Sequence, residues 1–148
     1  MNEDIKYMNE ALKQAKKAQL LDEVPIGAVI VKDGKIIARG YNEKERKKDV
    51  TKHAELIAIQ RACKKLNNWR LTDCTLYITL KPCNMCTGAI NQARIKRVVI
   101  GTEYESKGSK ESHNVGNCEF GDNILVDVGI MEKECKEILQ NFFKEKRK

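Results

Sequence analysis

The sequence predicts one α/β domain of three layers, in which helices flank both faces of a mixed central sheet. A β-hairpin signal lies at Asp33-Gly34, a strand–helix–strand order lies between residues 75 and 101, and amphipathic patterns occur at both ends. A hairpin supplies antiparallel strands, whereas strand–helix–strand connections supply parallel ones. The 148 residues suffice for one core and are too few for two comfortable ones, so we expect a single domain over residues 1–148.

The first elements are a helix and a hairpin. Apolar residues recur at helical intervals from about residue 3 to 20, with acids early and lysines late. A short β-branched run over 26–31 then reaches Asp33-Gly34, a strong signal for a tight turn between strands. Ile36 begins the returning strand, which we expect to end near Tyr41.

A second helix is predicted from His53 to Leu66, after a highly charged loop. Thr51 is its expected N-cap, since threonine side chains accept hydrogen bonds from the first amides of a helix. Its core face carries an apolar stripe at helical spacing: Leu56, Ile59, Cys63 and Leu66.

The second half alternates strands and helices. Strands are expected over 75–80 and 97–101 with a short helix between them, which implies a right-handed parallel crossover. A polar stretch over 102–123 precedes a strand over 124–128, and a last helix begins near Glu132.

Two motifs, His53-Ala54-Glu55 and Pro82-Cys83-Asn84-Met85-Cys86, bring zinc-type ligands into the chain. Zinc binds imidazole and thiolate well, and a catalytic zinc keeps three protein ligands and one open position. Cys83 and Cys86 are three residues apart, so on one helical turn their sulfurs face the same way. Pro82 suits the entry to a helix, whose positive N-terminal end favours thiolates. We therefore predict a zinc ion held by His53, Cys83 and Cys86.

Glu55 is the predicted catalytic residue. It follows His53 by two positions, which on a regular helix turns it about 200° away. It should not share the metal with His53, but it can flank the open position and carry a proton between water and substrate.

A structural zinc with four protein ligands is the alternative. Cys118, His113 or Cys74 could supply the fourth ligand. However, Cys74 begins a predicted strand, and the other two lie in a polar loop, so the catalytic interpretation is preferred.

Composition and charge limit the kinds of partner and the cellular compartment that we expect. The 28 basic residues exceed the 21 acidic ones, a net charge of +7 that suits a polyanionic partner. Aromatic residues make up only 5%, which argues against an extended platform for stacking single-stranded bases. No apolar stretch approaches the roughly 20 residues of a membrane span, and the N-terminus lacks the order of a signal peptide, so we expect a cytoplasmic protein.

Several segments together resemble the bacterial tRNA-specific adenosine deaminase family. They are Val24 to Val29, Gly40-Tyr41-Asn42, His53-Ala54-Glu55, Asn68 to Leu71, Thr79 to Cys86, Arg94 to Val99 and Phe142-Phe143. The order H-x-E then P-C-x-x-C is the signature of zinc nucleobase deaminases. The resemblance implies a cytidine-deaminase-like fold, a homodimer, one Zn²⁺ per subunit, and conversion of the wobble adenosine of a tRNA anticodon stem-loop to inosine.

The resemblance also implies roles for individual residues. The implied zinc ligands are His53, Cys83 and Cys86. Glu55 would be the proton shuttle. The implied substrate-binding residues are Asn42, Ile26 and Ala54. Asn42 would bind the flipped base, although an asparagine is equally suited to a turn that closes a strand. Ile26 would form a pocket wall, or simply pack in the core.

The chain departs from the family pattern beside the metal motif and after Gly101. Lys81 stands where the family usually has glutamate, and could alter the local field or point to solvent. The loop from Thr102 to Gly108 carries added acids, which are unhelpful near phosphates. Tyr104 could stack on a base or pack on a neighbouring loop, and the segment 109–123 could line the pocket or the dimer edge.

Three functions are therefore compared. The preferred one is a tRNA adenosine deaminase, which receives a base extruded from the anticodon loop. A deaminase of free bases or nucleosides, of guanine or cytosine type, would share the same chemistry. A non-catalytic RNA-binding module with structural zinc ranks third.

Overall fold

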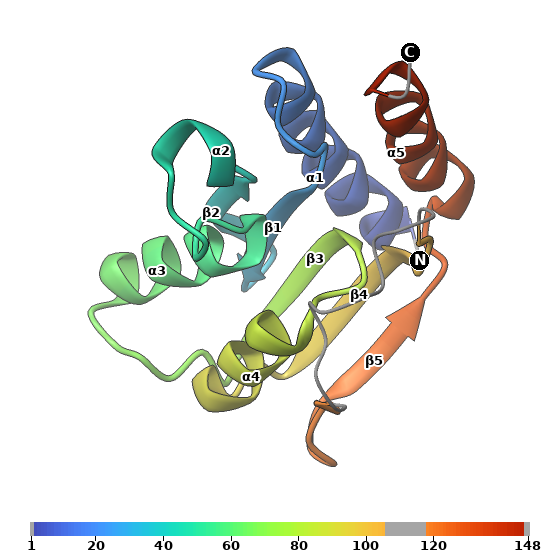
Figure 1. Cartoon of the computed structure of the whole chain (residues 1–148). Coiled ribbons are helices and arrows are strands. Elements are labelled where there is room, and N and C mark those ends of the chain that lie inside the picture. The colour runs from blue at the N-terminus through green and yellow to red at the C-terminus, as the bar shows by residue number, and fades with distance from the viewer. Residues whose placement is uncertain (1, 106–117, 147–148) are drawn as a thin grey trace.

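A five-stranded mixed sheet forms the centre of the molecule, and its strand order is β2-β1-β3-β4-β5 (Figure 1). The structure is a computed structural model, and it describes residues 2–105 and 118–146. Both edge strands come from the expected sequence regions, and the predicted three-layer architecture is confirmed.

The hairpin consists of β1 (Gly27–Lys32) and β2 (Lys35–Tyr41), which pair in antiparallel fashion. Its turn residues Asp33 and Gly34 have φ values of 52° and 74°. Positive φ at both central positions is the turn geometry that matches the twist of paired strands, and it explains the Asp-Gly signal.

The other half of the sheet is parallel. β3 (Cys74–Leu80) pairs antiparallel with β1 and parallel with β4 (Arg97–Thr102), which pairs parallel with β5 (Leu125–Val128). The helix α4 (Asn84–Ala93) makes the connection between β3 and β4, as the sequence predicted.

Two pairs of helices cover the two faces of the sheet (Figure 1). The first core cluster joins one face to α4 and α3 (Ala54–Leu66) through residues such as Ala58, Ile78 and Ile90. The second joins the other face to α1 (Asn2–Leu20) and α5 (Glu132–Lys146) through residues such as Met8, Val99 and Leu139. Alternate side chains of the central strands β1, β3 and β4 thus enter different cores.

The charged loop before α3 differs from the prediction in two ways. Residues Lys44–Lys47 form a short helix, α2, where only a loop was expected. Thr51 is not the N-cap of α3: its hydroxyl donates to Asp49 at 2.6 Å, and His53 occupies the capping position. An acid two residues upstream offered Thr51 a local partner, which competes with helix capping.

The start of α3 is pressed against β2. A Cβ atom on Gly40 would lie 2.5 Å from the carbonyl oxygen of Ala54 and 3.0 Å from the amide nitrogen of Ala58. Only glycine allows this close approach, which places the first turn of α3 at the sheet. Within the described ranges, no helix has the length and apolar character needed to cross a bilayer.

Candidate active site

Three side chains from the starts of two helices converge at one point. The Nδ1 atom of His53 lies 3.7 Å from the Sγ atom of Cys83 and 3.4 Å from that of Cys86. The three ligand atoms all lie within 4.8 Å of one another. The motifs are some 30 residues apart in sequence, and the fold brings them together because α4 follows β3 while α3 begins beside β2.

Both of these helices begin later than expected: the helix predicted from His53 starts at Ala54, and the helix whose entry was expected at Pro82 starts at Asn84. His53 and Cys83 are N-cap residues with extended backbones, with ψ values of 149° and 176°. Cys86 alone of the three lies within a helix, so the two sulfurs do not share one regular helical turn. They still meet, because an N-cap side chain can turn back over the first turn of its helix.

The three donors fit zinc. A tetrahedral zinc with bonds of about 2.3 Å to sulfur and about 2.1 Å to nitrogen separates the two kinds of ligand atom by about 3.6 Å. The observed separations of 3.4 and 3.7 Å bracket this value. Among the described residues, no fourth cysteine, histidine or acid belongs to the group. That excludes Cys74 and Cys118 as partners in this arrangement, while His113 lies outside the described residues.

The contact between the two thiols shifts their pKa values in opposite directions. Hydrogen bonding from Cys86 lowers the pKa of Cys83 to about 4, and the same contact, together with burial, raises the pKa of Cys86. The hydrogen bond with Cys83 also raises the pKa of His53. One thiolate is therefore present at neutral pH, and a bound dication would favour loss of the second proton.

Glu55 lies beside this group without belonging to it. Its side chain is only 4% exposed, and burial raises the pKa of its carboxyl group to about 7. A carboxyl group with a pKa near neutrality is suited to accept and release protons. The buried acid and the ligand group together make a site where water could be activated.

Asn42 fixes the first turn of α3. Its side chain is 7% exposed, and its Oδ1 atom accepts a hydrogen bond of 2.8 Å from the backbone N–H of Ala54. The side chain therefore supplies from a distance the capping that His53 does not provide. Its Nδ2 group makes no hydrogen bond to the described residues and remains available as a donor.

Comparison with known proteins places the chain in a family. The model of the MafB19-like deaminase family matches residues 2–147. The tRNA-specific adenosine deaminase of Bacillus subtilis is 44% identical over 151 aligned residues, covering 100% of this chain and 93% of the relative. The chain belongs to the tRNA-specific adenosine deaminase family.

Solved structures agree with this family assignment. A structure described in a study of A-to-I editing by tRNA:A34 deaminases has a TM-score of 0.78 at 41% identity, covering 90% of this deaminase and 99% of that chain. A guanine deaminase from Bacillus subtilis is 44% identical with a TM-score of 0.61, but the match covers 64% of this deaminase and 61% of that chain. The cytidine-deaminase-like fold is therefore confirmed.

The two other predicted substrate residues of the deaminase lie close to Asn42. Ile26 is half-buried against both core clusters, and its carbonyl oxygen accepts a hydrogen bond from the amide of Asn42 at 3.2 Å. Ala54 is fully buried, so its methyl group packs in the core while its N–H holds Asn42. The three residues form one connected support at the start of α3.

The structure shows the surroundings of the residues at which the chain departs from the family pattern, and of Cys118. Lys81 is exposed, and Tyr104 packs against the cluster beneath α1 and α5. Cys118 is tied to α4, because its amide donates to the Oδ1 atom of Asn84 at 3.0 Å. Most of the segment 109–123 that we singled out lies outside the described residues.

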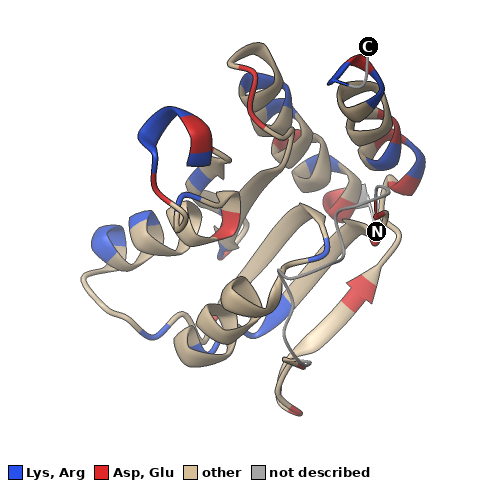
Figure 2. Cartoon of the chain, in the orientation of Figure 1, with Lys and Arg blue, Asp and Glu red and all other residues tan. Residues whose placement is uncertain are grey.

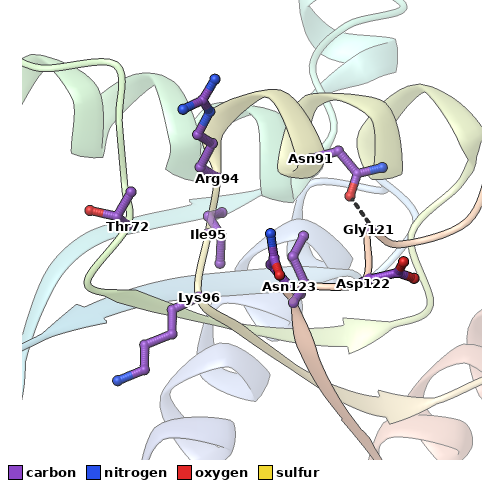
Figure 3. A pocket seen from close by; sticks show the side chains of 9 residues that line it. Thr72, Asn91, Arg94, Ile95, Lys96, Gly121, Asp122 and Asn123 are labelled. Atoms are coloured by element: carbon purple, nitrogen blue, oxygen red, sulfur yellow. Dashed lines mark hydrogen bonds between the residues drawn. The ribbon is translucent and has the colours of Figure 1, made fainter.

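A cavity of about 480 Å³ lies away from this site, at the other end of α4. Figure 3 shows Asn91 of α4 and Arg94, the residue directly after this helix, on the rim of the cavity. The side chains of Arg94 and Lys96 are directed away from its centre. The Oδ1 atom of Asn91 accepts a hydrogen bond of 2.9 Å from the amide of Gly121, which ties the chain before β5 to α4. The cavity contains none of the predicted site residues.

Sequence reasoning missed Glu23. This acid is 1% exposed, and its carboxylate accepts hydrogen bonds from two backbone amides of α2. Nothing in its spacing marks it, since it precedes the Val24-Pro25 pair as an ordinary acid after a helix. The one feature of the sequence that could have drawn attention to Glu23 was its position directly before Val24, where the segment that resembles the family begins.

Proposed function

We propose that this chain deaminates adenosine to inosine by hydrolysis at the wobble position of a tRNA anticodon. One observation carries the proposal: a buried carboxyl group, Glu55, stands beside an imidazole and two sulfurs that form a three-ligand group. A site with three donors and a nearby acid suits hydrolysis, whereas a structural zinc needs four ligands. The adenosine and the tRNA come from the name of a relative that is 44% identical over the whole chain.

His53, Cys83 and Cys86 would hold one Zn²⁺ per subunit. Zinc supplies Lewis-acid activation of water, which makes a nucleophile available at neutral pH. The soft sulfur and nitrogen donors match zinc better than magnesium or calcium, which prefer oxygen.

Glu55 would move the protons. Its carboxylate takes a proton from the attacking water and passes it to N1 of the adenine ring. As the water oxygen bonds to C6, Glu55 would take the second proton of that water from the new C6 hydroxyl and deliver it to the amine. The C6–N bond would then break, and the amine would leave as ammonia. Both transfers need a carboxyl group that changes protonation near neutral pH, and burial of Glu55 raises its pKa to about 7.

Asn42 and its neighbours would receive the flipped base. The Nδ2 group of Asn42 is a hydrogen-bond donor for an acceptor on the purine edge, and the bond from Ala54 to Oδ1 fixes the orientation of the amide. Ile26 would supply an apolar wall for the ring. A base must leave its stack to reach this position, as in other enzymes that modify bases.

Basic residues would hold the phosphates of the RNA, and a homodimer would be the active form. The α2 helix and the end of α5 carry lysines and arginines (Figure 2). A tRNA substrate implies a cytoplasmic location, which we propose together with it. The homodimer is proposed from the family resemblance.

An assay with two substrates tests this function. Purified protein is incubated with an anticodon stem-loop that carries adenosine at the wobble position, and inosine is measured by mass spectrometry after nuclease digestion. A matched stem-loop with guanosine at that position is the control. We expect inosine only from the first RNA.

The same protein is then given free guanine, cytosine and adenosine, and ammonia is measured. The shorter match to a guanine deaminase makes guanine the important comparison. Rapid turnover of guanine, together with no inosine in the RNA, would replace the proposed function with free-base deamination.

A further inference from the structure

The carboxylate of Glu23 holds the first turn of α2 by two hydrogen bonds. Its Oε1 atom accepts from the amide of Glu45 at 3.0 Å, and its Oε2 atom accepts from the amide of Arg46 at 2.6 Å. The two segments are 22 and 23 residues apart in sequence, so the contact is tertiary and not a local turn. Hydrogen bonds to a charged acceptor are the strong kind.

Burying the carboxylate of Glu23 costs free energy of desolvation, which an uncharged residue at this position would avoid. Glu23 is 1% exposed, and no lysine or arginine pairs with it in the part of the chain that the structure describes. A buried charge needs partners, and here the backbone amides of one short turn are those partners. Glu23 therefore orders the turn, and it does not neutralise the cations that the turn carries.

The turn that Glu23 holds is basic and adjoins the site. Residues 44–48 read Lys-Glu-Arg-Lys-Lys, and Figure 2 shows α2 as a largely blue element. Lys47 and Lys48 are exposed, and no ion pair joins them to the described residues. By contrast, Arg46 pairs with Glu43 at 3.1 Å.

Both ends of this segment are fastened at the site itself. At one end Asn42 holds the amide of Ala54, and the amide of Glu43 donates to the carbonyl oxygen of Lys52 at 2.9 Å. The segment is thus a closed loop that leaves the site at Asn42 and returns to it at His53. Glu23 supplies the third point of attachment, at the tip.

We infer that Glu23 is a positioning residue for the RNA substrate: it fixes the turn 44–48 so that Lys47 and Lys48 meet phosphates beside the flipped nucleotide. The inference rests on the proposed function, because it needs an RNA substrate. Lysines on a fixed turn lose less conformational freedom on binding than lysines on a mobile one. The side chain of Glu23 itself does not touch the substrate.

Charge alone predicts the opposite effect. Removal of a carboxylate near a polyanion should strengthen binding, because repulsion is lost. A positioning role predicts weaker binding, because the turn is released. The sign of the change therefore separates the two explanations.

The experiment compares Glu23→Ala with Glu3→Ala, which removes an equal charge from an exposed position on α1. We expect Glu23→Ala to raise KM for the stem-loop about tenfold while kcat changes less than about twofold, a loss of about 1.4 kcal/mol in binding. The slope of log K against log salt should become shallower by about 1 to 2. Glu3→Ala should leave both quantities unchanged.

A second comparison asks whether Glu23 acts through the lysines. In a chain that carries Lys47→Gln and Lys48→Gln, Glu23→Ala should add less than about twofold to KM. Glu23→Gln keeps one hydrogen-bond acceptor and should give an intermediate effect on KM. It replaces Glu23→Ala if the alanine variant fails to bind metal or shows no cooperative thermal unfolding. Amide exchange at Glu45 and Arg46 should accelerate in both variants.

The outcomes separate this inference from the proposed function. An unaltered protein that makes no inosine defeats the proposed function. An active protein in which Glu23→Ala lowers kcat with KM unchanged, or in which the effect survives loss of both lysines, defeats the role of Glu23 alone.

Discussion

Glu55 and the group of His53, Cys83 and Cys86 show how neighbouring side chains acquire different acid–base properties. The sulfur and nitrogen atoms face one another within 4.8 Å, whereas the carboxyl group of Glu55 is buried beside them without joining the group. Burial raises the pKa of that carboxyl group, while the contact from Cys86 lowers the pKa of Cys83 to about 4. The same small volume thus contains a carboxyl group suited to proton transfer and a thiolate suited to a metal.

Glu55→Gln should abolish catalysis while keeping the metal. The amide has nearly the same shape but cannot accept and return a proton, so the rate of inosine formation should fall about 10²- to 10⁴-fold. Rate and zinc content are measured on the same preparation. Glu137→Gln, on the exposed side of α5, is the control. An active Glu55→Gln protein would contradict the proton-transfer role.

Cys83→Ser should remove the metal and reduce stability. A ligand that binds only the folded state stabilises it, and a loss of about 3 kcal/mol corresponds to a fall in Tm of about 6 to 12 °C. Elemental analysis and thermal unfolding measure both effects, and a chelator should reproduce them in the unaltered protein. Cys63→Ser is the matched control, since Cys63 lies outside the ligand group. Equal zinc content in both variants would exclude Cys83 as a ligand.

The grouping of His53, Cys83 and Cys86 could be predicted from sequence because these residues lie in two compact motifs. Glu23 and the capping role of Asn42 could not, because both act over distances that no local spacing encodes: Glu23 bonds residues 22 and 23 positions away, and Asn42 bonds Ala54. A buried acid is recognisable only once the fold shows what covers it.

At the scale of elements, α3 and α4 both begin at the candidate active site. α3 starts directly after His53 and α4 directly after Cys83, so both residues occupy N-cap positions. Periodicity predicts the interior of a helix well, but the first residue depends on tertiary contacts such as those of Gly40 and Asn42. The short helix α2 escaped prediction for a related reason, since four charged residues carry no apolar period and a distant acid holds their first turn.

The start of α1 is tied to the sheet by a partly buried charge cluster. Asp4 accepts hydrogen bonds from Arg97 at 2.7 and 2.9 Å and from the hydroxyl of Tyr77 at 2.6 Å. The bonds from Arg97 are the main reason that the pKa of Asp4 is lowered to about 2. These contacts join α1 to β3 and β4.

Asp4→Asn should reduce stability by about 2 kcal/mol at pH 7. Because the pKa of Asp4 is lower in the folded than in the unfolded state, its contribution is complete above about pH 4 and is lost as the pH falls towards 2. Chemical unfolding should therefore give a gap between the two proteins that closes over this pH range. Asp127→Asn also removes a partner of Arg97 but at an exposed position, and it should cost less than about 1 kcal/mol. A constant gap would rule out this source of stability.

For the whole molecule, net charge bears on the proposed binding of RNA. The excess of 28 basic over 21 acidic residues creates a field that attracts a polyanion, and the exposed lysines of α2 and the end of α5 place part of it on the surface (Figure 2). Composition predicted this tendency, but which elements carry basic residues at the surface could be learned only from the fold.

Binding of the stem-loop should weaken steeply with salt. About four phosphate contacts to single-stranded RNA would reduce the association constant about fiftyfold between about 50 and about 200 mM salt. Fluorescence anisotropy with a labelled stem-loop measures the dependence, and catalytically inactive Glu55→Gln protein prevents turnover during the titration. An association constant that stays level across this range would argue for a small, uncharged substrate.

The edge strand β5 has a consequence for the behaviour of the protein in concentrated solution. All four of its residues are exposed, three of them are Leu125, Val126 and Val128, and no strand borders its outer side among the described residues. Such an edge is a template for further strands, and a charge within it opposes fibril growth. Asp127 is that charge, so its replacement by an apolar residue would leave an unbroken apolar run from Ile124 to Val128, on which copies could stack and precipitate.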